Sequence, residues 1–374
     1  MVTRISMENF RCIEKLKLPL KKINVFVGRN NTGKSSILYA IAVGTGNLDI
    51  LPDNVLDTLI MERKSEAVIK VEDEINTKVK IKNSPEDARK IITDIITQIL
   101  PFIYEKYKLK VDQEKLIPKI IEKVEKLPIL EFTVKTGNKE KTIKTFLRPG
   151  YVASKIEDAI YHVKSFEESE VYLKYAPIYP YVKKIIPPID YKIKNAVLYK
   201  EIENYIELKG EDKLDFELAL QELLYRGYRV DIEGNVIILS KKANGEIIKR
   251  KIFIDREGDG FKALLNILNL FVKSKRGILL LEEPENHMHP GYINLLVKYL
   301  IEYYKKFDVQ IFITTHSIDL IEALIAYLDK KKNIQKDFQI VHMSKRENTM
   351  EAEVMDYSKA KNTHKELQWD LRGI

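Results

Sequence analysis

The sequence predicts an α/β fold with a mixed sheet that is interrupted by a large, mainly helical inserted segment. Strand and helix patterns alternate at both ends of the chain but not in its middle. A glycine-rich stretch, GRNNTGKSS at residues 28–36, lies between a predicted strand and a predicted helix. A second apolar strand, at residues 277–281, runs directly into two adjacent acids. These three observations fix the fold class.

The N-terminal part begins with strands and continues with a helix. Apolar periodicity predicts strands at 4–10, 12–18 and 23–28 and a helix after Lys34. Beyond about residue 230 the alternation returns, with a hairpin signal at Asn244-Gly245. The predicted elements there are strands at 229–240, 246–254, 277–281, 309–315, 338–343 and 350–356, and helices after 260, at 291–305, after 318 and at the C-terminus.

The middle of the chain has a different character. Ser84 and Pro85 resemble a helix start, and an apolar stripe follows them. A second amphipathic helix is predicted at 115–126, and a Tyr- and Pro-rich stretch at 175–191 is either a recognition surface or a rigid connector. We therefore expect residues 1–46 and 230–374 to form one discontinuous domain and 47–229 to form an insertion. The stripe consists of Ala88, Ile91, Ile92, Ile95, Ile96 and Ile99.

Composition excludes several classes of protein. The 374 residues are 45% hydrophobic and 32% charged, which is typical of a globular chain. A single cysteine, Cys12, leaves no internal disulfide and no cysteine-based zinc site. No segment resembles a signal peptide or a membrane span, so we expect a soluble, cytoplasmic protein. The net charge of +8 comes from lysines scattered among nearly as many acids, which favours a solvated surface over a nucleic-acid patch.

The stretch at residues 28–36 fits the phosphate-binding pattern G-x-x-x-x-G-K-[ST]. Backbone N–H groups of such a loop surround phosphates, and the following helix N-terminus adds partial positive charge. Lys34 is expected to neutralise the β- and γ-phosphates, and the Ser35 hydroxyl to bind Mg²⁺. The expected nucleotide-binding residues are Gly28, Asn30, Asn31, Thr32, Gly33, Lys34, Ser35 and Ser36.

The acids after residue 281 need a partner, because an unpaired carboxylate at the end of a core strand costs several kcal/mol. Such a strand either ends at the surface or meets a positive group such as a metal ion. In nucleotide-hydrolysing α/β folds a second strand presents a carboxylate beside the phosphate loop. Glu282 is therefore expected to bind Mg²⁺, and Glu283 to hold or deprotonate the attacking water.

Three motifs together resemble a known family. GRNNTGKSS, LLLEEPENHMHP and ITTHS are similar to ABC-type ATPase heads in the branch that contains RecF, SMC proteins and OLD-family ATPases. The opening ISMENFRCIEKLKL also resembles that branch, whereas transporter heads usually carry Asp-Glu-Pro in place of Glu-Glu-Pro. The resemblance covers residues 1–45 and 250–345. It implies a P-loop NTPase fold and a stand-alone, OLD-like ATPase, because 318–374 is too short for a nuclease domain.

The resemblance also implies roles for further residues. His316 would be the switch histidine that contacts the γ-phosphate. The stretch EGDGFKALLNI resembles the signature segment, although Gly258 stands where a serine is common. Backbone N–H groups of Gly258 and Gly260 would then bind a partner subunit's nucleotide; the alternative is an ordinary glycine-rich helix start.

Two other features stay open. His287 and His289 form a His-x-His pair that is either a metal site or part of the subunit interface, and the resemblance favours the interface. No glutamine loop can be placed, since Gln98 lies within a predicted amphipathic helix.

The leading hypothesis is a Mg²⁺-dependent ATPase that uses ATP and Mg²⁺ and dimerises head to head around ATP. By resemblance its cycle acts in DNA maintenance or in defence against mobile elements. The implied partners are a second copy, DNA and a separate nuclease or effector protein, with no membrane. One alternative is a nucleotide-gated nucleic-acid-binding module with little hydrolysis. The other is a transporter ATP-binding subunit, which Glu282 in place of Asp disfavours.

Overall fold

The computed structural model describes two compact units. Unit 1 consists of Met1–Arg4, Leu16–Ala42 and Lys194–Ile374, and unit 2 consists of Ile5–Lys15 and Val43–Ile193. Residues 194–229, which the sequence analysis placed in the insertion, are grouped with unit 1. The described residues are all of 1–374 except 57, 74, 108–112, 126, 147–151, 153–154, 157–193, 203–207, 245, 347–348 and 367–374.

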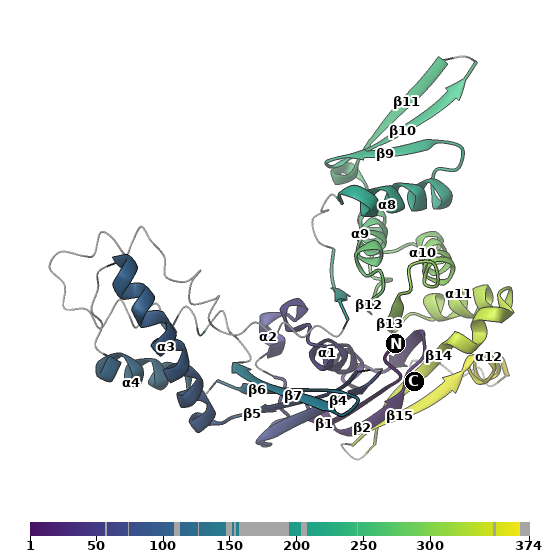
Figure 1. Cartoon of the computed structure of the whole chain (residues 1–374). Coiled ribbons are helices and arrows are strands. Elements are labelled where there is room, and N and C mark those ends of the chain that lie inside the picture. The colour runs from purple at the N-terminus through teal and green to yellow at the C-terminus, as the bar shows by residue number, and fades with distance from the viewer. Residues whose placement is uncertain are drawn as a thin grey trace. The chain divides into compact units, whose positions relative to one another are not determined.

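Unit 1 is built on a six-stranded mixed sheet in the order β15-β14-β3-β13-β12-β8 (Figure 1). Neighbouring strands are parallel except β15, which is antiparallel to β14. All residues of β3 and β13 are buried, as expected for central strands of a parallel sheet. The strands are β3 (Ile23–Gly28), β8 (Ala196–Tyr199), β12 (Ile278–Glu282), β13 (Gln310–Thr315), β14 (Phe338–Arg346) and β15 (Thr349–Asp356).

The sequence predicted every one of these strands but β8, and it predicted most of the helices. Helix α11 is capped by Ser317, whose Oγ accepts a hydrogen bond from Leu320 N at 3.3 Å. Helix α10 has Pro290 at its first turn, where a missing N–H costs nothing. The helices are α1 (Lys34–Gly44), α8 (Gly210–Leu223), α9 (Asp259–Lys273), α10 (Pro290–Tyr303), α11 (Ile318–Asp329) and α12 (Tyr357–Glu366), with 3₁₀ turns at Ile254–Arg256 and Lys332–Asp337.

A three-stranded antiparallel sheet, in the order β11-β10-β9, also belongs to unit 1. Its strands are β9 (Arg229–Glu233), β10 (Val236–Ala243) and β11 (Glu246–Phe253). The turn between β10 and β11 is confirmed, with Asn244 at φ 52°. The segment 229–240 forms two strands, because Gly234 turns the chain with φ 54°.

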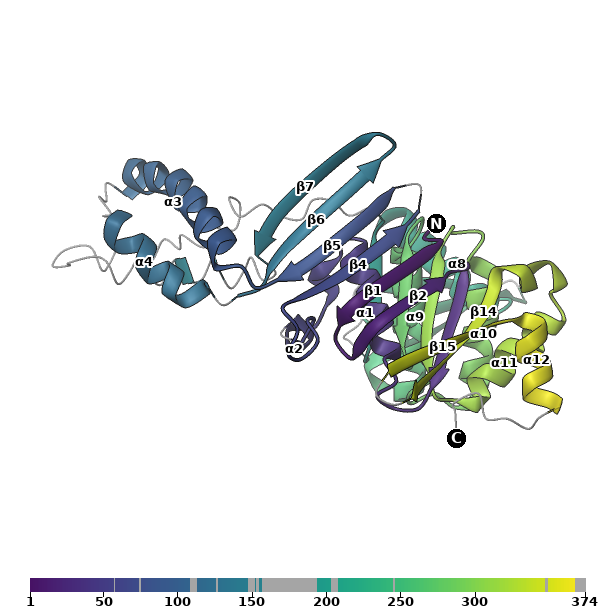
Figure 2. The ribbon, with the colours of Figure 1, turned by 90° about the horizontal axis from the view of Figure 1, so that it is seen from below.

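Unit 2 contains most of a sheet in which strands lie in the order β2-β1-β4-β5-β6-β7 (Figure 2). The predicted helix start is confirmed: Ser84 Oγ accepts from Asp87 N at 3.4 Å. The predicted stripe packs against the second helix, with Ala88, Ile92, Ile95, Ile96 and Ile99 buried and Ile91 partly buried. Strands β4 and β5 were not predicted, so the described part of the insertion combines its helices with a larger sheet than expected. The elements are β1 (Arg4–Phe10), β2 (Ile13–Pro19), η1 (Leu48–Ile50), α2 (Asp53–Leu56), β4 (Glu66–Glu72), β5 (Asn76–Lys82), α3 (Pro85–Tyr107), α4 (Gln113–Val124), β6 (Ile129–Thr136) and β7 (Lys139–Phe146).

Two further expectations concern the Tyr- and Pro-rich stretch and membrane-spanning helices. The Tyr- and Pro-rich stretch at 175–191 lies outside the described residues. Within the part of the chain that is described, no helix combines the length and the apolar character needed to cross a bilayer.

Candidate functional site

The loop that follows β3 has a backbone that only glycine can supply at its first position. Gly28 has φ 145°, and a Cβ there would lie 2.1 Å from the carbonyl oxygen of Met343 on β14. Gly33 has φ 85°, and Thr32 Oγ1 donates to the carbonyl of Arg29 at 2.8 Å. The loop is therefore held closely against β14, and its N–H groups lead into the N-terminus of α1.

Lys34 is the first residue of α1 and is only 6% exposed. Its Nζ donates to the carbonyl oxygens of Gly28 at 2.9 Å and Arg29 at 2.8 Å. Burial lowers the pKa of Lys34 to about 8, and the nearby Glu283 carboxylate opposes this shift. The ammonium is thus kept in the loop by weak acceptors that a phosphate could replace.

Glu282 ends the buried strand β12 beside α1. Tyr39, which is 2% exposed on α1, donates its hydroxyl to Glu282 Oε2 at 2.8 Å. No role was predicted for Tyr39 from the sequence. Its signal was a polar aromatic on a helix whose other residues after Ser36 are Ile, Leu, Ala, Val and Gly.

Glu283 and His316 meet at the ends of adjacent strands. Their Oε1 and Nε2 atoms are 3.0 Å apart, so the ring N–H can donate to the carboxylate. Glu283 has φ 46°, a conformation that is strained for a residue other than glycine, and its N–H donates to Thr314 O at 3.0 Å. Both side chains remain partly exposed, at 37% for Glu283 and 30% for His316, which leaves them accessible to water and substrate.

Glu285, the third acid of the motif, also belongs to this network. Its Oε1 accepts from the Thr315 hydroxyl and from His316 N, the latter at 3.4 Å. Its Oε2 is buried and has no hydrogen-bond partner among the described residues. Desolvation raises the pKa of Glu285 above its ordinary value, against the effect of these hydrogen bonds. The residue fixes the turn that carries His316, a role that the sequence analysis did not assign.

The expected Mg²⁺ ligands provide a hydroxyl from Ser35 and a carboxylate from Glu282. Oxygen donors of this kind suit Mg²⁺, which usually keeps several waters and uses one or two protein ligands with substrate phosphates. Among the described residues no three His, Cys, Asp or Glu side chains cluster as a protein cage would need. The donor set therefore fits Mg²⁺ bound together with a nucleotide.

The two glycines of the signature segment differ in their surroundings. Gly258 is exposed as the N-cap of α9, and a Cβ there would meet nothing within 4 Å. A Cβ on Gly260 would lie 2.7 Å from the carbonyl oxygen of His287. Gly260 is thus needed for packing, whereas Gly258 is exposed and its carbonyl accepts hydrogen bonds from Phe261 N and Lys262 N.

The two histidines after Glu285 are parts of a turn. His287 has φ 68°, and His289 caps α10 by accepting a hydrogen bond from Gly291 N on its Nδ1 at 3.2 Å. Gln98, by contrast, is exposed on α3 in unit 2.

A cavity of about 590 Å³ borders the phosphate loop. Its lining comes from the loop, including Arg29 and Asn30, and from the β14–β15 hairpin, including Lys345 and Glu353. Its volume lies within the range of ligand pockets.

Comparisons with known proteins agree with the motifs. Residues 23–322 match a family described as "AAA domain, putative AbiEii toxin, Type IV TA system". An ATP/GTP phosphatase from Helicobacter pylori is 23% identical over 352 residues, which are 88% of this chain and 89% of that protein. An OLD nuclease from Thermus scotoductus is 42% identical over 48 residues, which are 13% of this chain and 9% of that protein.

Among solved structures, the SMC head domain from Thermotoga maritima aligns with a TM-score of 0.47 and 12% identity. The alignment covers 95% of this chain and 99% of that chain.

Proposed function

The chain is a P-loop ATPase that belongs to this family of AAA domains, and we propose that it hydrolyses ATP with Mg²⁺ at the strand-end site described above. The observation that carries the proposal is the 3.0 Å contact between Glu283 and His316 at the ends of β12 and β13. A carboxylate–imidazole pair held at this strand edge, beside the phosphate loop of β3, suits control of an attacking water.

In this proposal each side chain acts on one part of the substrate. Lys34 leaves its loop carbonyls for the β- and γ-phosphate oxygens, and Ser35 and Glu282 hold Mg²⁺, which neutralises phosphate charge when bound. Tyr39 keeps Glu282 oriented through Oε2. Loop N–H groups of residues 30–33 and the hydroxyl of Ser36 complete the phosphate contacts.

Hydrolysis then requires a positioned water. Glu283 accepts a hydrogen bond from this water and takes its proton as the new P–O bond forms and the bond between the γ-phosphorus and the β–γ bridging oxygen breaks. His316 donates to Glu283 Oε1 and contacts the γ-phosphate. Glu283 follows the last residue of β12 with φ 46°, so the chain leaves the strand direction at this residue.

We further propose that two copies close head to head around ATP. Support comes from Gly258, whose exposed position at the N-cap of α9 leaves first-turn N–H groups available to a neighbour's phosphates. The similarity to an OLD nuclease and the family description support a role in DNA maintenance or defence against mobile elements. A separate nuclease or effector protein would then act after the two copies have closed around ATP.

The alternative is a nucleotide-gated nucleic-acid-binding module with little hydrolysis. It is favoured by Gly258, because a signature segment without its usual serine offers the neighbour's phosphate one contact fewer. Turnover of ATP by the purified wild-type protein separates the two functions.

Glu283→Gln tests the proposed mechanism. Turnover should fall by about 100-fold or more, since general-base residues contribute about 10²–10⁴-fold, while ATP binding stays intact. With ATP bound, the Glu283→Gln protein should form a dimer with twice the monomer mass in light scattering. This dimer should separate when ATP is removed. Adding Gly258→Arg should block this dimer and spare ATP binding, because a Cβ at this exposed position has no neighbour within 4 Å. Wild-type turnover in Glu283→Gln would contradict the assigned role.

A further inference from the structure

The β10–β11 hairpin is an open edge of unit 1. Its eight-residue strands pair along their whole length, from Val236↔Phe253 to Ala243↔Glu246. Strand β11 is the last of its sheet, and every residue of it but Ile252 is exposed. Figure 1 shows β10 and β11 extending beyond β9 and α8, away from β12 and β13. A strand that is open on both faces and along one edge is a surface for binding rather than for packing.

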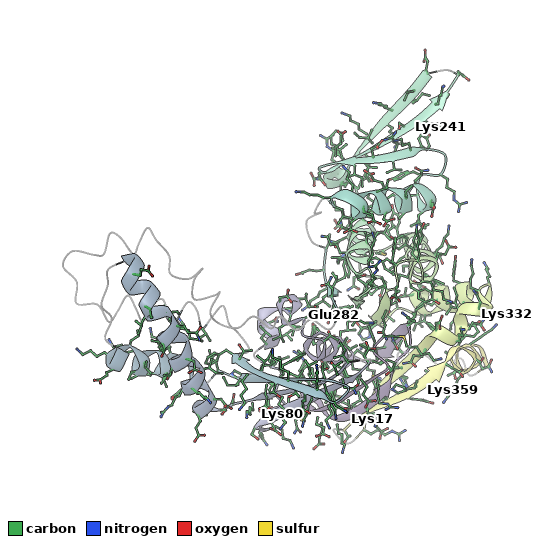
Figure 3. All side chains as sticks on the ribbon, viewed as in Figure 1. Lys17, Lys80, Lys241, Glu282, Lys332 and Lys359 are labelled. Atoms are coloured by element: carbon green, nitrogen blue, oxygen red, sulfur yellow. The ribbon has the colours of Figure 1, made fainter. Side chains whose placement is uncertain are left out.

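The hairpin concentrates positive charge. Five exposed cations stand against a single acid, Glu246, and none of the five forms an ion pair with a described carboxylate. One of the five, Lys241, lies over an aromatic ring, with its Nζ 5.6 Å from the ring centroid of Tyr228. Figure 3 shows Lys241 far from Glu282, so the catalytic acids do not neutralise this charge. The cations are Lys241, Lys242, Lys249, Arg250 and Lys251.

Apolar side chains lie beside these cations at the tip. Ile247 is 68% exposed and Ile248 57% exposed. The register places Ile247 opposite Lys242 and Ile248 opposite Lys241. Because successive strand residues point to opposite faces, each face of the tip carries one isoleucine and one lysine.

Edge lysines often serve only to prevent strand pairing between molecules. At Lys241 and Lys242 the β10 strand is paired with β11 alone, because its pairing with β9 covers only Val236–Ser240, so the tip is a two-stranded ribbon with two open edges. Protection of these edges does not explain the two adjacent isoleucines, Ile247 and Ile248, that stand in water beside the cations.

We propose that the β10–β11 hairpin is an arm that binds duplex DNA. A two-stranded β-ribbon fits the major groove, and exposed cations on both faces can meet the phosphates on both groove walls. Isoleucine can contact a thymine methyl group or enter between base steps. An acidic peptide added beside β11 would lie in the plane of the sheet and would not reach the cations of β10, so a duplex is the better partner.

The arm also has a route to the ATP site. Strand β11 leads through one 3₁₀ turn, Ile254–Arg256, into Gly258 and α9. Ile254 N donates to Asn235 O at 3.0 Å, which ties this turn to the base of the hairpin. The inference rests on the proposed function only in taking DNA as the partner; binding itself requires no hydrolysis.

Fluorescence anisotropy with a labelled blunt duplex tests the arm, at about 50 mM and about 200 mM salt. The variant is Lys249→Gln with Arg250→Gln and Lys251→Gln. The matched control removes three exposed lysines from the end of α11 and the 3₁₀ turn Lys332–Asp337, as Lys330→Gln with Lys332→Gln and Lys336→Gln. We expect the hairpin variant to lose about 10- to 100-fold in affinity and about three units of salt slope, and the control to stay close to wild type.

Further measurements separate the possible outcomes. Ile247→Ser with Ile248→Ser should weaken binding and leave the salt slope unchanged, since no charge is lost. ATP turnover without DNA and Tm should match wild type in all these variants. Equal losses in the hairpin variant and the control, no binding of DNA by the wild type, or binding of anionic vesicles only would overturn the proposal. Turnover is measured separately, so failure of the ATPase assignment leaves this result readable.

Discussion

Unit 1 holds two groups of charged side chains that differ in burial and in pairing. At the strand-end site each described charge is partly buried and has a fixed partner: Lys34 has two loop carbonyls, Glu282 has Tyr39, and Glu283 has His316. On the β10–β11 hairpin the cations are exposed and have no described carboxylate beside them.

The difference follows from the cost of desolvation. A charge taken out of water must be paired, and the pairing fixes its position to within hydrogen-bond distance. Such a site suits a reaction at one phosphorus atom. Exposed lysines and arginines keep their hydration and their rotamer freedom, so they suit an extended polyanion whose charges they can follow. Burial and pairing of charge therefore distinguish the proposed catalytic site from the proposed DNA-binding hairpin.

The largest effect should come from removing a buried charge of the strand-end site. Lys34→Ala removes the main side-chain partner of the β- and γ-phosphates, and hydrogen bonds to charged groups contribute about 1.5–3 kcal/mol each. We expect ATP affinity to fall by about 100-fold, measured with a fluorescent nucleotide. Lys17→Ala removes an exposed lysine of the same unit and should leave affinity unchanged. An ATP affinity equal to wild type in folded Lys34→Ala would end the phosphate-loop assignment.

Much of this fold could be predicted because its signals are local. The glycines at 28 and 33 mark the loop, and apolar runs at 23–28, 277–281 and 309–315 mark the central strands. The sequences of β4 and β5 also alternate between apolar and polar residues, which matches their alternating burial, but no strand was predicted there. Strand β8 has only four residues, and its partner β12 begins about 80 positions later, so no local pattern distinguishes it.

The missed site residues depend on pairings that are distant in sequence. Tyr39 and Glu282 are separated by 243 positions, and Glu285 and Thr315 by 30. A motif tells which chemistry is present, but the group that orients each acid comes from whichever strand or helix the topology brings beside it. Glu285 was visible in the sequence as part of the acidic motif, and only the parallel pairing of β12 and β13 gives it Thr315 as a partner.

A smaller effect is expected from removing the hydrogen bond between Tyr39 and Glu282. Tyr39→Phe removes one hydrogen bond to a carboxylate, worth about 1 kcal/mol, without removing any charge. We expect the Mg²⁺ concentration at half-maximal turnover to rise by about fivefold. Tyr327→Phe is a matched control, since Tyr327 also donates to a glutamate, Glu302, on the α10–α11 surface. Equal Mg²⁺ dependence in Tyr39→Phe and wild type would mean that this pairing does not orient the carboxylate.

The smallest effect concerns Glu285, the one acid of the site with an unpaired buried oxygen. Burial raises its pKa in the folded protein, so the folded state holds the proton more tightly than the unfolded state does. Its contribution to stability is therefore complete below the unfolded pKa and is lost as pH rises through the folded pKa. Glu285→Gln has no proton to lose, while its Oε1 can still accept from Thr315 and from His316 N.

The substituted amide adds a buried donor, which shifts stability by the same amount at every pH. Burial and the Glu285 carboxylate raise the pKa of Tyr199 to about 12, which lies above the pH range measured here. The difference in Tm between variant and wild type should therefore move in favour of the variant as the pH rises from about 5, above the ordinary pKa of a glutamate, towards about 8. Differential scanning fluorimetry across this range measures it. A difference that stays constant with pH would show that the buried carboxyl of Glu285 is not the group that titrates, and that the cost of burying charge at this strand end is borne elsewhere.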